Sequence, residues 1–415
     1  MFRNYLLTAW NVFMRRKLFT AINLVCIVLT LVVLMVITAL LENAFYPRGV
    51  EGKSDRFLQV LLLDATGPRT TISSPLGYKI IEKYLKPMKS VEMVSAVSLP
   101  RTVAVYQQDR ISALAMRNTD AEYWKILDFR VVSGRVISAD DVAQGRFVAV
   151  VNASSARQLF PVKFPKTTAL GQKINVAGQM FEIIGIVEDE MHVNAFADLW
   201  TPVTTLPSSD YRQQYSGDFT ALLLAKNAGD LPQLRDEVEQ IARTVLWDDP
   251  KKITQVRFWA DSKLDTFARI VVGNARSADS GAARLMSTIV IAMLLFMALP
   301  ALNLVNLNTG RILERRSEIG VRKAFGATSS HLVWQLVIEN MLLCVVGGLL
   351  GLACAKGVLW WLEGSGLIPY LKVDMNFAIF GYGLLLSLVF GLMSGVIPAW
   401  KMARLDPVHA LKGNA

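Results

Sequence analysis

The 415-residue sequence has few of the side chains that build catalytic and metal sites. It contains three histidines and three cysteines, and it has no Gly-x-x-x-x-Gly-Lys-Ser/Thr loop for holding nucleotide phosphates. It also has no Gly-x-Ser-x-Gly elbow for presenting a serine nucleophile. We therefore expect no nucleotide-binding loop of this kind in the chain, and nucleophilic catalysis has no support.

Cysteine occurs only in apolar segments, where Cys26, Cys344 and Cys354 are expected to behave as small buried hydrophobes. The long polar region between the first two apolar segments has none, so it is predicted to fold around its own core without disulfides. Histidine gives one candidate metal cluster, at 188–192, which combines three carboxylates with His192. Because no second ligand pair follows at a recognisable spacing, we predict a solvated turn and no metal site.

Apolar residues are abundant, at 53% of the chain, and the mean hydropathy is +0.36. A bilayer core is crossed by roughly 20 apolar residues in a helix. Four segments satisfy this requirement, at 18–41, 287–307, 332–354 and 377–400. The first is longer than the apolar part of a signal peptide, so we interpret it as a retained anchor. The sequence predicts an α-helical membrane protein with four transmembrane helices and a large α+β domain inserted between helices 1 and 2.

The formal net charge of +10 is a topology signal. Twelve basic and three acidic residues fall in the N-terminal segment (1–17), the loop at 308–331 and the tail at 401–415, whereas 42–283 holds 29 basic and 28 acidic residues. Basic residues accumulate on the cytoplasmic side of membrane proteins. Both termini and the 308–331 loop are therefore predicted to be cytoplasmic, with 42–286 and a short loop at 355–376 outside. Nucleic acid is not needed to explain the charge.

The outer region alternates strand and helix patterns. Apolar runs predict strands at 57–64, 146–152, 173–178, 180–189, 219–226 and 253–260. A helix capped by Ser74, with Pro75 in its first turn, would open a βαβ-like unit, and 231–247 reads as an amphipathic helix. The strands suggest two α+β lobes, about 50–110 with 205–262 and 111–204. From Asp261 a helical stalk could run unbroken into the second span; a flexible linker is the alternative, because glycine and serine interrupt the pattern.

The loop at 314–328 is a charged cluster between two apolar segments, and it also carries an apolar stripe. A positive-inside loop requires only charge, so the stripe favours a docking surface. The candidate contact residues are Arg315, Arg316, Glu318, Ile319, Gly320, Arg322, Lys323, Phe325, Gly326 and Ala327.

Several residues within the apolar segments are candidates for helix contacts. Glu339 is a costly carboxylate in the third segment, with either a packing and coupling role or access to interfacial water. Asn303 and Asn306 either hydrogen-bond between helices or mark a wet helix end. Two small-residue motifs permit close helix packing. These are Gly347 with Gly351 and Gly391 with Gly395.

The 314–328 loop resembles the signature of permease subunits in the MacB/FtsX/LolC-E superfamily of ABC transporters. Other segments are similar to the same family, in the same order: an amphipathic N-terminal helix at 1–17, a periplasmic core domain in the outer region, and the ending at 397–413. The residues at matching places in the loop are Arg315, Glu318, Ile319, Gly320, Arg322, Gly326 and Ala327.

The resemblance implies a non-catalytic permease of the bacterial inner membrane that transmits motion to the periplasm. Its partners would be cytoplasmic ABC ATPase subunits, which bind the ATP–Mg, and a second permease copy or paralogue; a periplasmic adaptor and an outer-membrane duct are further candidates. The chain itself would need no cofactor. Candidate cargoes are a peptide, a drug, a siderophore or a lipoprotein. The alternative is an FtsX-like scaffold that regulates a periplasmic cell-wall hydrolase.

Overall fold

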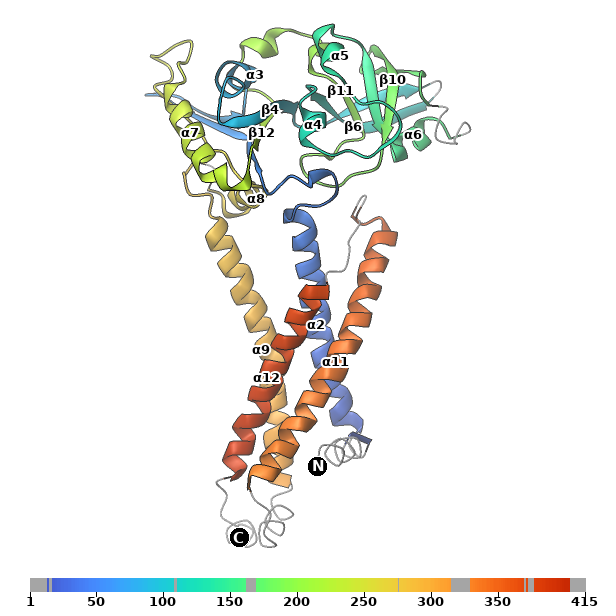
Figure 1. Ribbon diagram of the computed structural model, residues 1–415, viewed down its shortest axis with the longest axis vertical. Helices are drawn as coiled ribbons and strands as arrows, with labels where there is room; N and C mark the ends of the chain where they lie inside the picture. Colours follow the sequence, from blue (N-terminus) through green and yellow to red (C-terminus); the bar gives the residue numbers. More distant parts are fainter. Residues whose placement is uncertain are drawn as a thin grey trace. The chain divides into compact units, whose positions relative to one another are not determined.

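The computed structural model describes residues 13–14, 17–107, 110–161, 169–274, 276–314, 329–368, 371 and 377–403. The chain divides into two compact units (Figure 1). One, here called the helical unit, contains 1–43, 286–368 and 372–415. The other, here called the inserted domain, contains 44–285 and 369–371.

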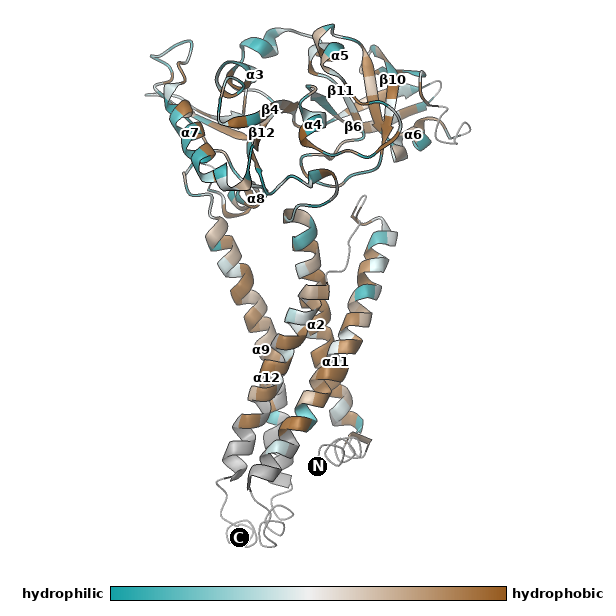
Figure 2. Cartoon of the chain, in the orientation of Figure 1, coloured by the Kyte–Doolittle hydropathy of each residue, from teal (hydrophilic) through white to brown (hydrophobic). Residues whose placement is uncertain are grey.

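The described part of the helical unit consists of long apolar helices, which Figure 2 shows as largely hydrophobic ribbons. Among the described residues, three helices contain segments long and apolar enough to cross a membrane: 20–45 of α2 (Lys17–Phe45), 282–299 of α9 (Ala282–Glu314) and 337–365 of α11 (Ser329–Ser365). The fourth helix, α12 (Phe377–Ala403), has a shorter apolar stretch at 380–393. Helix α11 continues to Ser365, through the first half of the loop expected at 355–376. Most of the amphipathic helix expected at 1–17 lies outside the described residues.

The larger sheet of the inserted domain has ten strands among the described residues, in the order β1-β12-β4-β6-β11-β8-β10-β9-β5, with β7 beside β10. Their bounds are β1 Phe57–Val60, β4 Val91–Ser98, β5 Arg101–Gln107, β6 Arg110–Thr119, β7 Val131–Gly134, β8 Val148–Asn152, β9 Lys173–Val176, β10 Gln179–Val187, β11 Leu199–Pro202 and β12 Phe219–Ala225. Because β5 also pairs with β6, the strands β6, β11, β8, β10, β9 and β5 close into a ring.

A small second sheet has the order β13-β2-β3, formed by β13 (Gln255–Phe258), β2 (Leu62–Thr66) and β3 (Thr71–Pro75). Helix α7 (Leu231–Thr244) buries Leu234, Val238 and Ala242 at i, i+4 and i+8 in the same core as this sheet. The other short helices are α3 (Tyr78–Ile80), which continues as a π-helical turn (Ile81–Leu85), α4 (Tyr123–Ile126), α5 (Ala139–Ala143), α6 (Ala153–Leu159) and α8 (Lys263–Val272).

Strand β12 shows how one sheet serves two cores. All seven of its residues are buried, because β1 and β4 flank it and both of its faces are covered. Its side chains alternate: Ala221 and Leu223 enter the core shared with α7, whereas Leu222 and Leu224 enter a core around Trp200. A third core fills the strand ring. The core shared with α7 consists of residues from 58–96 and 203–260, and the ring core consists of residues from 103–199. The core around Trp200 contains residues from both of these parts of the chain. The two expected lobes therefore stay a prediction.

Two local expectations in the outer region are wrong. The run at 57–64 forms two strands in different sheets, because Gln59 exchanges backbone hydrogen bonds with Asp261 and the chain then leaves β12 for β13. Ser74 and Pro75 belong to strand β3 rather than to a helix start. Proline is tolerated there because β3 is an edge strand and Pro75 is its last residue. The resulting β2–β3 hairpin is antiparallel, so no βαβ unit opens here.

The stalk is also interrupted. Helix α8 ends at Val272, because Gly273 adopts a left-handed conformation (φ 76°) that favours glycine. Helix α9 begins at Ala282. The segment between them, 273–281, is called the linker below; its residue 275 lies outside the described part. The expectation of one continuous helix from Asp261 is therefore wrong.

Candidate functional site

The ten predicted docking residues, at 315–327, lie outside the described residues. The structure describes their flanks, which are the end of α9 at Glu314 and the start of α11 at Ser329. The docking role of Arg315, Glu318 and Arg322 therefore stays a prediction.

Among the predicted polar residues of the apolar helices, Glu339 lies on α11 and is 1% exposed, as is its neighbour Asn340. A carboxylate in this setting is costly to bury unless it is neutral or paired. Asn306 is exposed on α9, and the side chain of Asn303 lies outside the described residues. Of the predicted polar residues whose side chains are described, Glu339 is thus buried within the helices and Asn306 is exposed.

The predicted glycines lie at helix contacts, as far as they are described. A methyl group added to Gly347 would come within 2.6 Å of Ile27 on α2, and one added to Gly351 within 3.2 Å of Leu31. A methyl group added to Gly391 on α12 would likewise collide with Cys344 of α11. The surroundings of Gly395 are outside the described part. Helix α11 therefore packs against α2 and α12 at glycine positions.

The predicted turn at 188–192 is partly buried rather than solvated. Each acidic residue has its own partner: Glu188 pairs with Arg130, Asp189 accepts hydrogen bonds from Ser154, and Glu190 lies 3.1 Å from Nδ1 of His192. Sequence reasoning missed the partners of Glu188 and Asp189 because they come from distant segments. Within the described ranges, no group of three His, Cys, Asp or Glu side chains is arranged to hold a metal.

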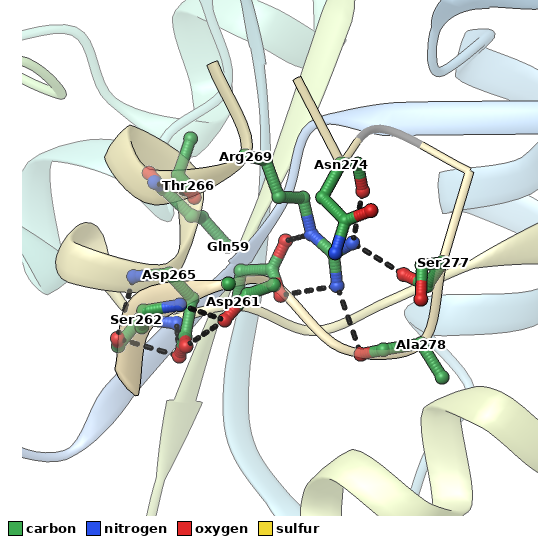
Figure 3. Close-up of polar contacts among 12 residues, drawn as sticks. Gln59, Asp261, Ser262, Asp265, Thr266, Arg269, Asn274, Ser277 and Ala278 are labelled. Atoms are coloured by element: carbon green, nitrogen blue, oxygen red, sulfur yellow. Dashed lines mark hydrogen bonds and ion pairs between the residues drawn. The ribbon is translucent and has the colours of Figure 1, made fainter. Parts of the chain in front are cut away.

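A polar site that sequence reasoning did not find surrounds α8 and the linker of the inserted domain (Figure 3). Arg269 of α8 is 3% exposed and lies between Asp261 and the linker. Its Nε and one terminal nitrogen donate to the two carboxylate oxygens of Asp261, at 2.6 and 3.1 Å. The remaining donors reach the backbone carbonyls of Asn274, Ser277 and Ala278.

All five N–H donors of the Arg269 guanidinium are therefore used, two on a carboxylate and three on the linker. The ring of Trp259 covers the same group at 4.7 Å. Burial raises the pKa of Asp261 above its ordinary value, and the ion pair with Arg269 only partly opposes this effect. The arrangement fixes the linker to the sheet through one side chain, and we call it the Arg269 clasp.

A second carboxylate ties three elements together. Asp265 caps α8 with Ser262, accepts a 2.7 Å bond from Arg235 of α7, and accepts a 2.6 Å bond from Ser280 of the linker. Burial alone would raise the pKa of Asp265, but the hydrogen bonds from Ser280 and Ser262 and the charge of Arg235 outweigh it, so the pKa is lowered. Gln59 of β1 adds a side-chain bond to Thr266. A capping pattern, Ser-x-x-Asp at 262–265, and Gly273 were the available sequence signals for this site.

The fold and this site define the class of the protein. A folded α+β domain is inserted between helices that are apolar enough to cross a membrane, and its exit toward α9 is held by buried polar bonds. This is the architecture of a membrane protein that carries a large folded domain between its apolar helices.

Comparison with known families identifies the kind of membrane protein. Residues 20–241 match the MacB-like periplasmic core domain, which is more than half of the chain, and residues 290–407 match the FtsX-like permease C-terminal region. The chain belongs to the MacB/FtsX family of ABC transporter permeases. The family resemblance seen in the sequence is confirmed.

Individual relatives are distant. The uncharacterized ABC transporter permease YknZ of Bacillus subtilis is 24% identical over 333 residues, which is 80% of this chain and 77% of YknZ. The macrolide export ATP-binding/permease protein MacB of Campylobacter jejuni is 26% identical over 342 residues, which is 79% of this chain and 48% of MacB. The chain thus spans about half the length of the MacB relatives that it matches.

Solved structures show weaker similarity. The match to the extracellular domain of YknZ covers 48% of this chain and 98% of that domain's chain, at 18% identity and a TM-score of 0.36. The periplasmic region of MacB from Actinobacillus actinomycetemcomitans covers 54% of this chain and 96% of its own, at 15% identity and a TM-score of 0.39.

Proposed function

We propose that the chain is the permease subunit of an ABC exporter that transmits motion from a cytoplasmic ATPase to the inserted domain. The 415 residues contain no phosphate-binding loop, so ATP would be bound outside them, and we propose that a separate ATPase chain binds it. In this proposal four helices span the inner membrane, both termini are cytoplasmic, and the inserted domain is periplasmic.

The observation that carries this proposal is the Arg269 clasp. A domain joined to its membrane helix by a free, flexible linker would not follow a displacement of that helix. Here the linker backbone is bonded at three carbonyls to a buried side chain, which is itself bonded to Asp261 beside β13. A displacement of α9 would therefore be transmitted to the sheet and would not first be taken up by extension of the linker.

The cytoplasmic input would enter through the 314–328 loop. Arginine binds carboxylates through two parallel hydrogen bonds, and Glu318 can bind a basic residue of the ATPase. One relative, MacB, is named for macrolide export, which supports export as the activity. As cargo we propose a drug, a peptide, a siderophore or a lipoprotein. The cell-wall scaffold is not favoured, because the curated relatives are permeases and export proteins.

The experiment is purification of the full chain from its own host membrane, followed by identification of the proteins that co-purify and measurement of ATP hydrolysis. We expect no hydrolysis by the chain alone and hydrolysis by its complex with an ABC ATPase. The double charge reversal Glu318→Arg with Arg322→Glu should abolish co-purification. ATP turnover by the isolated chain, or an unchanged complex with the reversed charges, would contradict the proposal.

A further inference from the structure

The segment that follows α2 is buried in the inserted domain. Val50 and Glu51 lie in a short 3-10 helix (Gly49–Glu51), where Val50 belongs to the core around Trp200 and Glu51 is 0% exposed. A fully buried carboxylate is costly unless it is paired and hydrogen-bonded. The partners of Glu51 therefore show what this segment is held against.

One partner of Glu51 is Lys263, the first residue of α8. Its Nζ lies 2.8 Å from Oε2 of Glu51, and its side chain is 6% exposed. The same Nζ donates to the backbone carbonyl of Tyr46, at 3.4 Å. The Lys263 ammonium thus joins the segment that enters the domain to the helix that leads out of it.

The other oxygen of Glu51 accepts a 3.0 Å bond from the backbone N–H of Asn194. The loop around Asn194 is fixed in turn: the hydroxyl of Tyr123 donates to the Asn194 carbonyl at 2.8 Å, and buried Arg117 donates to the carbonyls of Val193 and Phe196. Glu51 is therefore anchored to the sheet as well as to Lys263.

Aromatic packing repeats the same connection. The ring of Phe45, at the start of the entering segment, lies 5.4 Å from the ring of Phe267, one turn along α8 from Lys263. All of these residues belong to the inserted domain. The entering segment (45–51) and the exit helix α8 are thus joined by a buried ion pair, by a hydrogen bond from the Lys263 side chain to a backbone carbonyl, and by a ring contact.

We propose that Glu51 and Lys263 are positioning residues for coupling, which make the entry and exit of the inserted domain move as one body. With the pair intact, displacement of the preceding and following membrane helices would turn the whole domain. Without it, the two connections could separate and the displacement would be absorbed locally. The inference rests on the proposed motion-transmitting function and specifies where that motion is focused.

The test compares two labels in the full chain bound to its ATPase. Spin labels are placed at Leu246 of the inserted domain and at Trp360 of α11, both of which are highly exposed, in a background without the native cysteines. The distance between the labels is measured without nucleotide and with ATP and vanadate. We expect a nucleotide-dependent distance change in the reference protein.

The informative variant is the double substitution Glu51→Gln with Lys263→Met. It removes both charges, so no buried charge is left unpaired, and the amide oxygen introduced by Glu51→Gln can still accept from the backbone N–H of Asn194. If the pair only supports stability, the double variant folds like the reference protein and shows the same distance change. If it couples the connections, the double variant keeps its thermal stability but loses the nucleotide-dependent distance change.

Asp141→Asn is the matched control. Asp141 lies on α5, and its carboxylate is also fully buried and paired with Arg135. Helix α5 is drawn at the opposite edge of the domain from α8 (Figure 1). This variant should lose stability and keep the distance change. A full distance change in the Glu51/Lys263 double variant would overturn the inference. Absence of any change in the reference protein would instead contradict the proposed function.

A measurement on the unsubstituted complex tests the inference if the double variant does not fold. Hydrogen exchange of peptides from 46–56 and 263–272 is followed with and without ATP and vanadate. Coupled segments should change protection together. A nucleotide response confined to one of the two segments would overturn the inference.

Discussion

Removal of the Arg269 guanidinium is the sharpest test of the clasp. Arg269→Met keeps much of the apolar stem but leaves the buried Asp261 carboxylate without its partner. Breaking a buried ion pair by removing one member costs about 3–5 kcal/mol. The linker carbonyls add little, because they can turn to water once the clasp is gone. We expect a loss of about 3–5 kcal/mol in the free energy of unfolding at pH 7.

The loss should depend on pH in a defined direction. The pKa of Asp261 in the folded protein is already raised by burial, and removing Arg269 raises it further. A group whose pKa is higher in the folded state binds a proton on folding, so stability increases as the pH falls toward the unfolded-state value. The variant should regain up to about 1.4 kcal/mol per pH unit between the two pKa values.

The assay is denaturant unfolding of the full chain in detergent, followed by tryptophan fluorescence from pH 7.5 down to pH 5, with hydrogen exchange of the linker as a local readout. Arg235→Met is the control, because the Arg235 side chain is 43% exposed and its pair with Asp265 should contribute less than about 1 kcal/mol. A loss at Arg269 no larger than that at Arg235, or one independent of pH, would refute the reasoning.

Three further predictions concern other parts of the chain. Gly347→Leu should lower the yield of folded protein in membranes, because its side chain would meet Ile27, whereas Gly357→Leu, with open space around it, should not. Burial raises the pKa of Asp120 to about 6, so the contribution of Asp120 to stability should fall by about 2 kcal/mol as the pH rises from 4 to 7, and Asp120→Asn should remove this contribution in pH-dependent melting. Gly273→Ala should cost about 1 kcal/mol in unfolding experiments, because φ is +76°.

Apolar runs and repeating apolar patterns in the sequence predicted the helices and strands whose residues are close together in the chain. The apolar runs at 18–41 and 332–354 lie in α2 and α11, and the amphipathic pattern after Leu231 lies in α7. Strands β8, β9, β10 and β12 also lie where alternation or continuous apolar character placed them. In these segments one residue period decides both the element and its buried face.

The strand ring was not predictable in this way. Strands β5 and β6 include charged and small residues, and what closes the ring is the pairing of Val105 with both Ser112 and Val176. The pairing with Ser112 belongs to a local hairpin, but the pairing with Val176 joins strands about 70 residues apart, so no short window of sequence contains it. The single strand predicted at 57–64 was wrong for a related reason. Before Asp64 this run has one polar residue, Gln59, and its side-chain partner Thr266 lies far along the chain.

The site was harder to predict than the fold, because each of its charges is meaningful only beside a distant partner. Glu51 pairs with Lys263, and Asp265 pairs with Arg235, so each member alone looks like an ordinary surface charge in the sequence. The predicted docking loop shows the reverse case. Its charges are neighbours in the sequence, so a pattern was visible there, but its residues lie outside the described part.

The location of these buried charges bears on how the domain could respond to force. An apolar contact has no preferred direction and can slide at small cost, whereas a guanidinium bound to a carboxylate loses its bonds when either side rotates. Apolar residues of similar volume in place of a buried ion pair are often as stabilising as the pair. A purely stabilising role would therefore not require the Arg269 clasp or the Glu51–Lys263 pair. Both lie where the chain enters and leaves the inserted domain, which is where directional contacts would resist relative rotation of the two connections.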